Sequence, residues 1–203
     1  YPVNLRVLQN AQGVIVHSEY SRNLAKFWYG KGFADDWRAI PLLRVPSPEP
    51  GRADSRLKLG FEPDDFIICS FGFLDPTKLN HRLPDAFLHS TLVNEPRCVL
   101  VFVGQNHGGE YGRKLLETMR ASGLGERIRI TGWADMETFR DYLATADVAV
   151  QLRTQSRGET SAAVLDCMNH ALATIVNANG SMAELPTDAL WMLPDTFEDA
   201  QLA

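Results

Sequence analysis

The sequence predicts an α/β fold in which helices cover both faces of a doubly wound parallel sheet. Its apolar runs of strand length are continuous rather than alternating, as expected for strands buried on both faces. Segments with helical spacing separate these runs, and this alternation is typical of a parallel sheet. The predicted strands are residues 66–71, 98–103, 128–131, 148–152 and 174–177, with a sixth at 189–193. The predicted helices are 83–92, 110–122, 136–144 and 161–170.

The first 49 residues show a different pattern. A β-branched run at 14–18 predicts a strand, the spacing over 19–29 predicts a helix, and 40–43 is a further apolar run. Prolines at 46, 48 and 50 then fix the chain in an extended form, which predicts a connection between domains. We therefore expect residues 1–49 to be the tail of one domain with its crossover. Residues 50–203 would then be a second domain that is truncated at its C-terminal end.

Composition limits the class of protein. The chain has 203 residues, with 20 basic and 25 acidic side chains and a formal net charge of -5. Without a basic excess, a general nucleic-acid partner is not expected. No apolar run is long enough to span a membrane, and nothing resembles a signal peptide. Cys69, Cys98 and Cys167 lie far apart in apolar surroundings, which predicts buried reduced thiols and a cytoplasmic protein.

Glycine follows nearly every predicted strand. In a parallel sheet, ligands bind outside the carboxyl ends of the strands, so residues just after each strand are candidates for a site. A single glycine there can simply serve a tight turn, but a set of them favours close approach of a ligand to the backbone. The set consists of Gly72, Gly104, Gly132, Gly158 and Gly180.

The segment 157–166, RGETSAAVLD, contains the most specific pattern. Thr160 or Ser161 is a suitable N-cap, and the free amides of a helix start favour a phosphate group. Glu159 and Asp166 are seven positions apart, or about two helical turns. If the helix begins early enough, both carboxylates face one groove and suit an extended ligand with a diphosphate between them. Alternatively, Glu159 is only a favourable first-turn charge and Asp166 a solvated acid.

Three other segments are weaker candidates. Lys78, shortly after the first strand of the sheet, is placed to meet a phosphate as a point charge. Trp133 could stack on a base, although a core position is the better expectation for one tryptophan. Residues 179–184 form a glycine turn before a short helix. The histidines show no metal spacing, and neither a Gly-x-Ser-x-Gly elbow nor a dinucleotide fingerprint is present.

The order of these segments resembles the C-terminal, donor-binding domain of retaining GT-B glycosyltransferases of family 4 (group 1), over about residues 66–193. That domain is a Rossmann-like sheet. Gly72 and Lys78 match its first-strand motif, but Phe73 stands where the family has an arginine. Asp166 falls at the second glutamate of the family's paired motif. Gly158 falls at the first, with Glu159 one position later, as in a variant of bacterial members.

Further positions follow the resemblance only in part. Asn179, Gly180 and Glu184 match the family's glycine turn and the acid after it. Ala171 and Ala173 replace its usual glycine and proline.

The resemblance implies transfer of a hexose, with retention, from a nucleotide diphosphate sugar to an acceptor hydroxyl. It implies no metal and no cofactor besides that donor substrate. Lys78, with Arg153 or Arg157, would stabilise the leaving diphosphate. A glycan or lipid-linked acceptor would bind a preceding domain, with peripheral association at the inner face of the membrane, so this part alone is expected to be inactive. The implied catalytic residues are Glu159 and Lys78, and the implied donor-binding residues are Gly72, Lys78, Trp133, Arg157, Gly158, Glu159, Thr160, Ser161 and Asp166.

The sequence also allows other interpretations of the function. The same sheet would serve a GT-B sugar-nucleotide epimerase. Phe73, Ala171 and Ala173 would also fit a catalytically degenerate GT-B domain that acts as a binding or assembly module. A nicotinamide-dependent oxidoreductase is a distant third because its fingerprint is missing.

Overall fold

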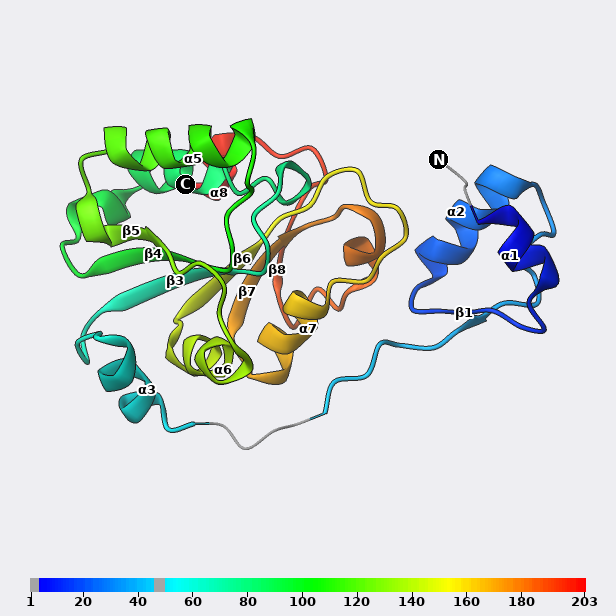
Figure 1. Cartoon of the computed structure of the whole chain (residues 1–203), viewed down its shortest axis with the longest axis horizontal. Helices are drawn as coiled ribbons and strands as arrows, with labels where there is room; N and C mark the ends of the chain where they lie inside the picture. The colour runs from blue at the N-terminus through cyan, green and yellow to red at the C-terminus, as the bar shows by residue number, and fades with distance from the viewer. Residues whose placement is uncertain (1–3, 46–49) are drawn as a thin grey trace.

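A six-stranded parallel sheet in the order β5-β4-β3-β6-β7-β8 forms the centre of the protein (Figure 1). The computed structural model describes residues 4–45 and 50–203. The strands are β3 (Phe66–Phe71), β4 (Cys98–Val103), β5 (Ile128–Ile130), β6 (Val148–Gln151), β7 (Ala173–Asn177) and β8 (Trp191–Leu193). The predicted fold class is therefore confirmed. β3 and β4 agree with the prediction at both ends, and the other strands differ by one or two residues.

Helices cover both faces of this sheet (Figure 1). One face carries α4 (Arg82–His89), α5 (Glu110–Ala121) and the short α8 (Asp199–Leu202), and the other carries α3 (Arg52–Leu59), α6 (Met136–Thr145) and α7 (Ala162–Asn169). Four 3-10 helices lie in the connections: η1 (Pro76–Lys78), η2 (Thr91–Asn94), η3 (Gly125–Arg127) and η4 (Gly180–Glu184). Alternate residues of each strand pack on opposite faces, so Ile67 lies in one core cluster while Leu100 and Phe102 lie in the other.

The strand order reverses between β3 and β6. From β3 the chain builds outward through β4 and β5, then returns to place β6 on the other side of β3 and continues to β7 and β8. The register joins Ile68 to Val148 and Cys69 to Ala149. The connections that leave these two neighbouring strands therefore diverge, which opens a crevice at their carboxyl ends.

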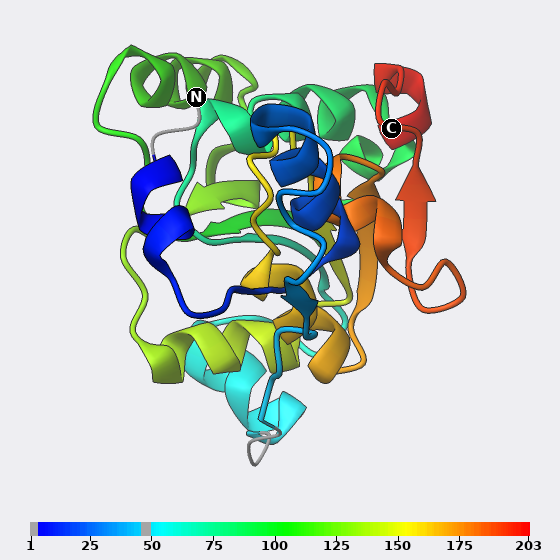
Figure 2. The ribbon, with the colours of Figure 1, turned by 90° about the vertical axis from the view of Figure 1, so that its right-hand side faces the viewer.

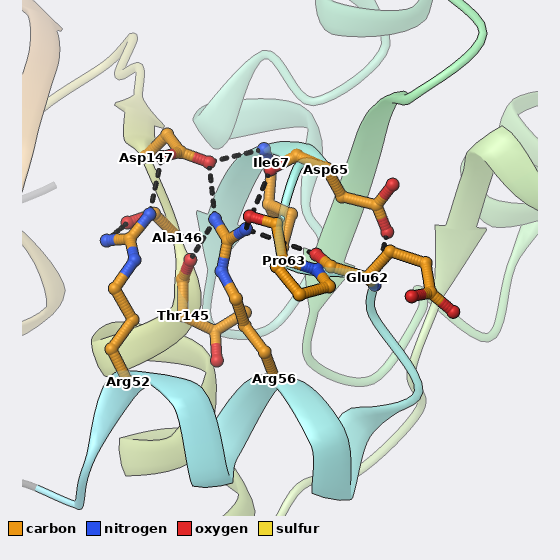
Figure 3. Close-up of polar contacts among 9 residues, drawn as sticks. All are labelled: Arg52, Arg56, Glu62, Pro63, Asp65, Ile67, Thr145, Ala146 and Asp147. Atoms are coloured by element: carbon orange, nitrogen blue, oxygen red, sulfur yellow. Dashed lines mark hydrogen bonds and ion pairs between the residues drawn. The ribbon is translucent and has the colours of Figure 1, made fainter.

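Helix α3 was not predicted, and its burial explains why. Its only buried residues are Ser55 and Arg56, so it lacks the apolar stripe that marks a helix in a sequence. Arg56 reaches between the helix and the sheet and donates to the carbonyls of Pro63 (2.6 Å) and Asp65 (3.0 Å) (Figure 3). It also pairs with Asp147 at 3.0 Å. Asp65 immediately precedes β3 and Asp147 immediately precedes β6, so this arginine attaches α3 to the start of both strands.

The N-terminal segment is a small unit of its own. It consists of α1 (Leu5–Asn10), α2 (Glu19–Tyr29) and the two-stranded pair β1 (Ile15–Val16) and β2 (Arg38–Ala39). The predicted helix 19–29 is confirmed, while the predicted strand 14–18 is shorter, and the apolar run 40–43 lies beyond β2. Most of the proline-rich connection, residues 46–49, lies outside the described residues. Figures 1 and 2 show this segment beside the carboxyl ends of the strands.

Cys69, Cys98 and Cys167 are buried and free, as predicted. Within residues 4–45 and 50–203, no helix has both the length and the apolar character needed to cross a membrane.

Candidate functional site

A cavity of about 180 Å³ lies where the strand order reverses. Its walls come from the ends of β3 and β6, from η1, from the start of α7 and from η4. The lining residues are Phe71, Lys78, Gln151, Leu152, Arg153, Ser161, Ala162, Ala163 and Met182. The structure thus brings together Lys78 and Ser161, two of the predicted site residues, from segments about eighty positions apart.

Lys78 is the last residue of η1, whose N-cap is Asp75. Its ammonium sits directly over Gly72: a Cβ added there would come within 2.7 Å of Nζ, and the φ of Gly72 is +97°. Only glycine allows both this close approach and this backbone conformation without strain. Burial and, after it, the positive charge of Arg153 lower the pKa of Lys78 to about 8. Gly72 and Lys78, which the sequence singles out as two positions of one motif, thus lie in contact, and their role in donor binding stays a prediction.

Arg153 contributes a second positive charge to the same cavity. Its side chain is 18% exposed, and its guanidinium lies 3.8 Å from the carboxylate of Glu159. The sequence suggests Arg153 only as an alternative to Arg157, whose side chain is exposed at the surface. The structure places Arg153, and not Arg157, in the cavity wall.

Gln151 was missed by the sequence analysis. It is 6% exposed at the end of β6, and its Nε2 has no hydrogen-bond partner among residues 4–45 and 50–203. The signal that could have found it is a polar residue inside the otherwise apolar run 148–152. Buried donors without acceptors are rare, so such a residue in a cavity points to a ligand.

Glu159 does not share a helix with Asp166. Helix α7 begins at Ala162 after the N-cap Ser161, whose hydroxyl accepts from the amide of Val164 at 3.5 Å. Glu159 therefore lies in the loop before the helix, where its carboxylate accepts from the amide of Arg157 at 2.7 Å. The predicted N-cap is confirmed, but the early helix start that would align the two carboxylates is not found.

Asp166 faces away from this cavity. Its carboxylate accepts two hydrogen bonds from the guanidinium of Arg44, from Nε at 2.6 Å and from Nη2 at 2.7 Å. It lines a separate hollow of about 270 Å³ beside Leu43 and Phe139. The structure does not bring Asp166 together with Lys78, nor is it the solvated acid of the alternative reading. Its predicted role in donor binding stays a prediction.

The remaining predicted residues fall into two groups. Thr160 and Gly158 lie in the loop before α7, and the hydroxyl of Thr160 is buried with no partner in the part of the chain that the structure describes. Trp133 is 76% exposed and does not line the cavity, so the expected core position is wrong. A solvent-exposed indole remains free to contact a base or a partner.

Helix α2 of the N-terminal segment packs against this loop region. The hydroxyl of Ser21 donates to the carbonyl of Gly158 at 2.5 Å. The carboxylate of Glu184 accepts from the amides of Glu19, at 2.9 Å, and Tyr20. These are the free amides of the first helical turn, which favour a negative charge. The acid that follows the glycine turn thus holds α2 and does not line the cavity.

Replacing Glu184 by alanine is expected to loosen α2 without unfolding the sheet. The change removes a charged acceptor from two helix amides, which costs about 1 kcal/mol for a cap of this kind. Hydrogen exchange at the amides of residues 19–29 should accelerate about fivefold, while exchange in β3 and β4 stays unchanged. Replacing the exposed Glu126 by alanine serves as the control. Equal exchange in both variants would mean that α2 is held without Glu184.

Among the residues of the described ranges, no group of three or more His, Cys, Asp or Glu side chains could hold a metal ion. The cavity itself offers two cations, the amides at the start of α7 and the buried amide donor of Gln151.

The comparisons with known proteins fit this site. A family model described as "Glycosyl transferases group 1" matches residues 51–201, more than half of the chain. The chain belongs to the group 1 glycosyl transferases. The match includes the whole range, 66–193, over which the sequence resembles such enzymes. This group 1 glycosyl transferase has no match among the curated proteins.

Solved structures show the same fold. HepE from Anabaena, solved with UDP and glucose, is 22% identical with a TM-score of 0.80, over 98% of this chain and 55% of that one. Sucrose-phosphate synthase from Thermosynechococcus elongatus is 23% identical with a TM-score of 0.79, over 97% and 49%. The C-terminal domain of the group 1 glycosyl transferase LpcC from Francisella tularensis is 19% identical with a TM-score of 0.65, over 78% and 81%. This group 1 glycosyl transferase spans about half the length of the first two.

Proposed function

We propose that this group 1 glycosyl transferase is a retaining GT-B enzyme of family 4 that transfers a hexose from a nucleotide diphosphate sugar to an acceptor hydroxyl. The observation that carries the proposal is the Lys78 ammonium, held over Gly72 in a cavity where the strand order reverses. HepE, which shares the fold, has been solved with UDP and with UDP-glucose. An anionic diphosphate is the ligand class that a buried cation beside a helix start recognises.

In the reaction, the bond between the anomeric carbon and the diphosphate oxygen breaks, and a bond to the acceptor oxygen forms on the same face of the sugar. The nucleoside diphosphate departs with the bonding electrons, and the acceptor hydroxyl transfers its proton to the departing diphosphate oxygen. Lys78 and the amides at the start of α7 would stabilise the charge that develops on the leaving group. Glu159, in the loop before α7, would bind the sugar hydroxyls.

The acceptor side of the reaction is part of the same proposal. We place residues 1–49 in a preceding domain and its crossover, and residues 50–203 in the donor-binding domain. A glycan or lipid-linked acceptor would bind the preceding domain, as in the synthesis of a polysaccharide, so this chain alone would bind donor without turnover. The reaction would need no metal and no cofactor besides the donor substrate. We also place the protein in the cytoplasm, at the inner face of a membrane, and its three free buried cysteines support the cytoplasmic part of this location.

A second candidate is a catalytically degenerate GT-B domain that serves as a binding or assembly module. Two observations favour it. Phe73 is 47% exposed at the position where the resemblance expects an arginine, and Asp166 is engaged by Arg44. Neither residue is available in this arrangement for the role that the resemblance assigns to its position.

A thermal-shift panel of UDP-, GDP- and ADP-sugars, followed by calorimetry, tests the proposal. We expect one nucleotide family to stabilise the chain, by about 2.7 kcal/mol at a concentration 100 times its dissociation constant. The matching nucleosides, which lack the diphosphate, should have much smaller effects because they cannot reach Lys78. Failure of every nucleotide sugar to bind would contradict the transferase and favour the module.

A further inference from the structure

Two cations face the cavity with little acid to balance them. No carboxylate of the described residues lies within 4.0 Å of the Lys78 ammonium, and Arg153 has only the half-exposed Glu159, at 3.8 Å. Like charges close together in a buried site destabilise each other unless an anion binds between them. Burial first, and then the charge of Arg153, lower the pKa of Lys78, while the negative charge of Asp75 opposes the change.

The backbone of Arg153 is held rigidly. Its amide donates to the side-chain oxygen of Asn177 at 2.7 Å, and its carbonyl accepts from the Asn177 amide group at 2.8 Å. Asn177 is completely buried on β7. The next amide, that of Thr154, donates to the carbonyl of Thr77 at 2.7 Å and so connects the end of β6 to η1, where Lys78 lies. The positions from which the two cations extend are therefore fixed relative to each other.

Gln151 adds an independent observation. It precedes Arg153 by two residues, lines the same cavity, and its buried Nε2 has no acceptor in the described part of the chain. A buried donor left without a partner costs free energy, so its retention at this place indicates an acceptor supplied by a ligand. A cavity that combines two cations with a buried N–H donor suits a group with several anionic oxygens.

We propose that Arg153 and Gln151, both from the end of β6, complete the binding site for the diphosphate of the donor together with Lys78. The inference rests on the proposed function and specifies it. Arg153 supplies the second cation that the resemblance places at position 73, where this chain has Phe73. When the bond to the anomeric carbon breaks, Arg153 stabilises the negative charge on the departing diphosphate.

Calorimetry with UDP, GDP, ADP and inorganic pyrophosphate tests the assignment. For the nucleoside diphosphate that binds the unmodified chain most tightly, Arg153→Ala should weaken binding about 10- to 30-fold, because a charge-assisted hydrogen bond is lost. Arg153→Lys should give an intermediate loss, since it keeps the charge but not the planar fork. Gln151→Leu should weaken binding several-fold. Arg113→Ala, at an exposed position on α5, is the matched control and should bind as the unmodified chain does.

A second readout separates binding from a structural role. If the charge of Arg153 acts on Lys78 across the cavity, the pH at which binding weakens should be higher in Arg153→Ala than in the unmodified chain. Should Arg153→Ala fail to fold, Arg153→Lys and Arg153→Gln take its place. Unchanged affinity in folded Arg153 variants would overturn the inference while leaving the donor site intact. Absence of binding to the unmodified chain would instead contradict the proposed function.

Discussion

Replacing Lys78 by alanine is expected to weaken nucleoside diphosphate binding by about 100-fold, which corresponds to about 2.7 kcal/mol. The ammonium lies over Gly72 in a cavity with little competing acid, so its interaction with an anion is poorly screened. Calorimetry on the unmodified chain and on Lys78→Ala measures the difference. A loss below threefold would mean that the diphosphate binds elsewhere.

The same lysine should make binding sensitive to alkaline pH. Because burial, with the charge of Arg153, lowers the pKa of Lys78 to about 8, the ammonium is charged at pH 7 and loses its proton as the pH rises through 8. Affinity for a diphosphate should therefore fall between pH 7.5 and 9, well below the range in which an ordinary lysine titrates. Lys78→Arg, which stays charged throughout, should bind with nearly constant affinity over this interval. A parallel fall in both proteins would assign the titration to another group.

Replacing Arg56 by alanine should reduce the free energy of unfolding by about 3–5 kcal/mol. The side chain is 6% exposed and donates to the carbonyls of Glu62, Pro63 and Asp65 as well as pairing with Asp147 (Figure 3). Its removal leaves the negative charge of Asp147 with one positive partner fewer and leaves several backbone carbonyls without a hydrogen-bond donor. Urea unfolding monitored by far-ultraviolet circular dichroism measures the change.

Arg52 offers a matched control on the same helix. It also pairs with Asp147, at 2.5 Å, but its side chain is 49% exposed. An exposed ion pair contributes about 0–1 kcal/mol, so Arg52→Ala should cost far less than Arg56→Ala. Similar small losses in both variants would show that water replaces the buried guanidinium. Similar large losses would show that Asp147, and not burial, decides the stability.

The sheet could be read from the sequence because each strand is buried on both faces. Continuous apolar runs such as Phe66–Phe71 and Cys98–Val103 give an unambiguous signal, and their boundaries agree with the structure. The positions of Gly72, Lys78 and Ser161 followed from a rule of topology, since ligands bind at the carboxyl ends of parallel strands. These residues indeed lie at one end of the sheet.

The attachment of α3, the direction of the carboxylates and the exposure of Trp133 depend on contacts between distant segments, which local sequence patterns do not encode. α3 is attached through Arg56 and not through an apolar stripe. Asp166 is engaged by Arg44, which lies 122 positions earlier, so the spacing of Glu159 and Asp166 could not reveal where either carboxylate points. The exposure of Trp133 likewise depends on the three-dimensional surroundings of its loop. Gln151, in contrast, could have been found from the sequence, because it is a polar residue within an apolar strand.

The pairing of β3 with β6 also bears on how the protein folds. Ile68 pairs with Val148, and the whole of β4 and β5 lies between them in the sequence, so this contact closes a long loop. Contacts between residues far apart in the sequence form slowly, because the chain loses the entropy of loop closure before the contact contributes any stabilisation. Lys78 and Arg153 are brought together by this pairing. Recovery of diphosphate binding during refolding should therefore lag behind the formation of helices, and ligand binding would report completion of the native topology.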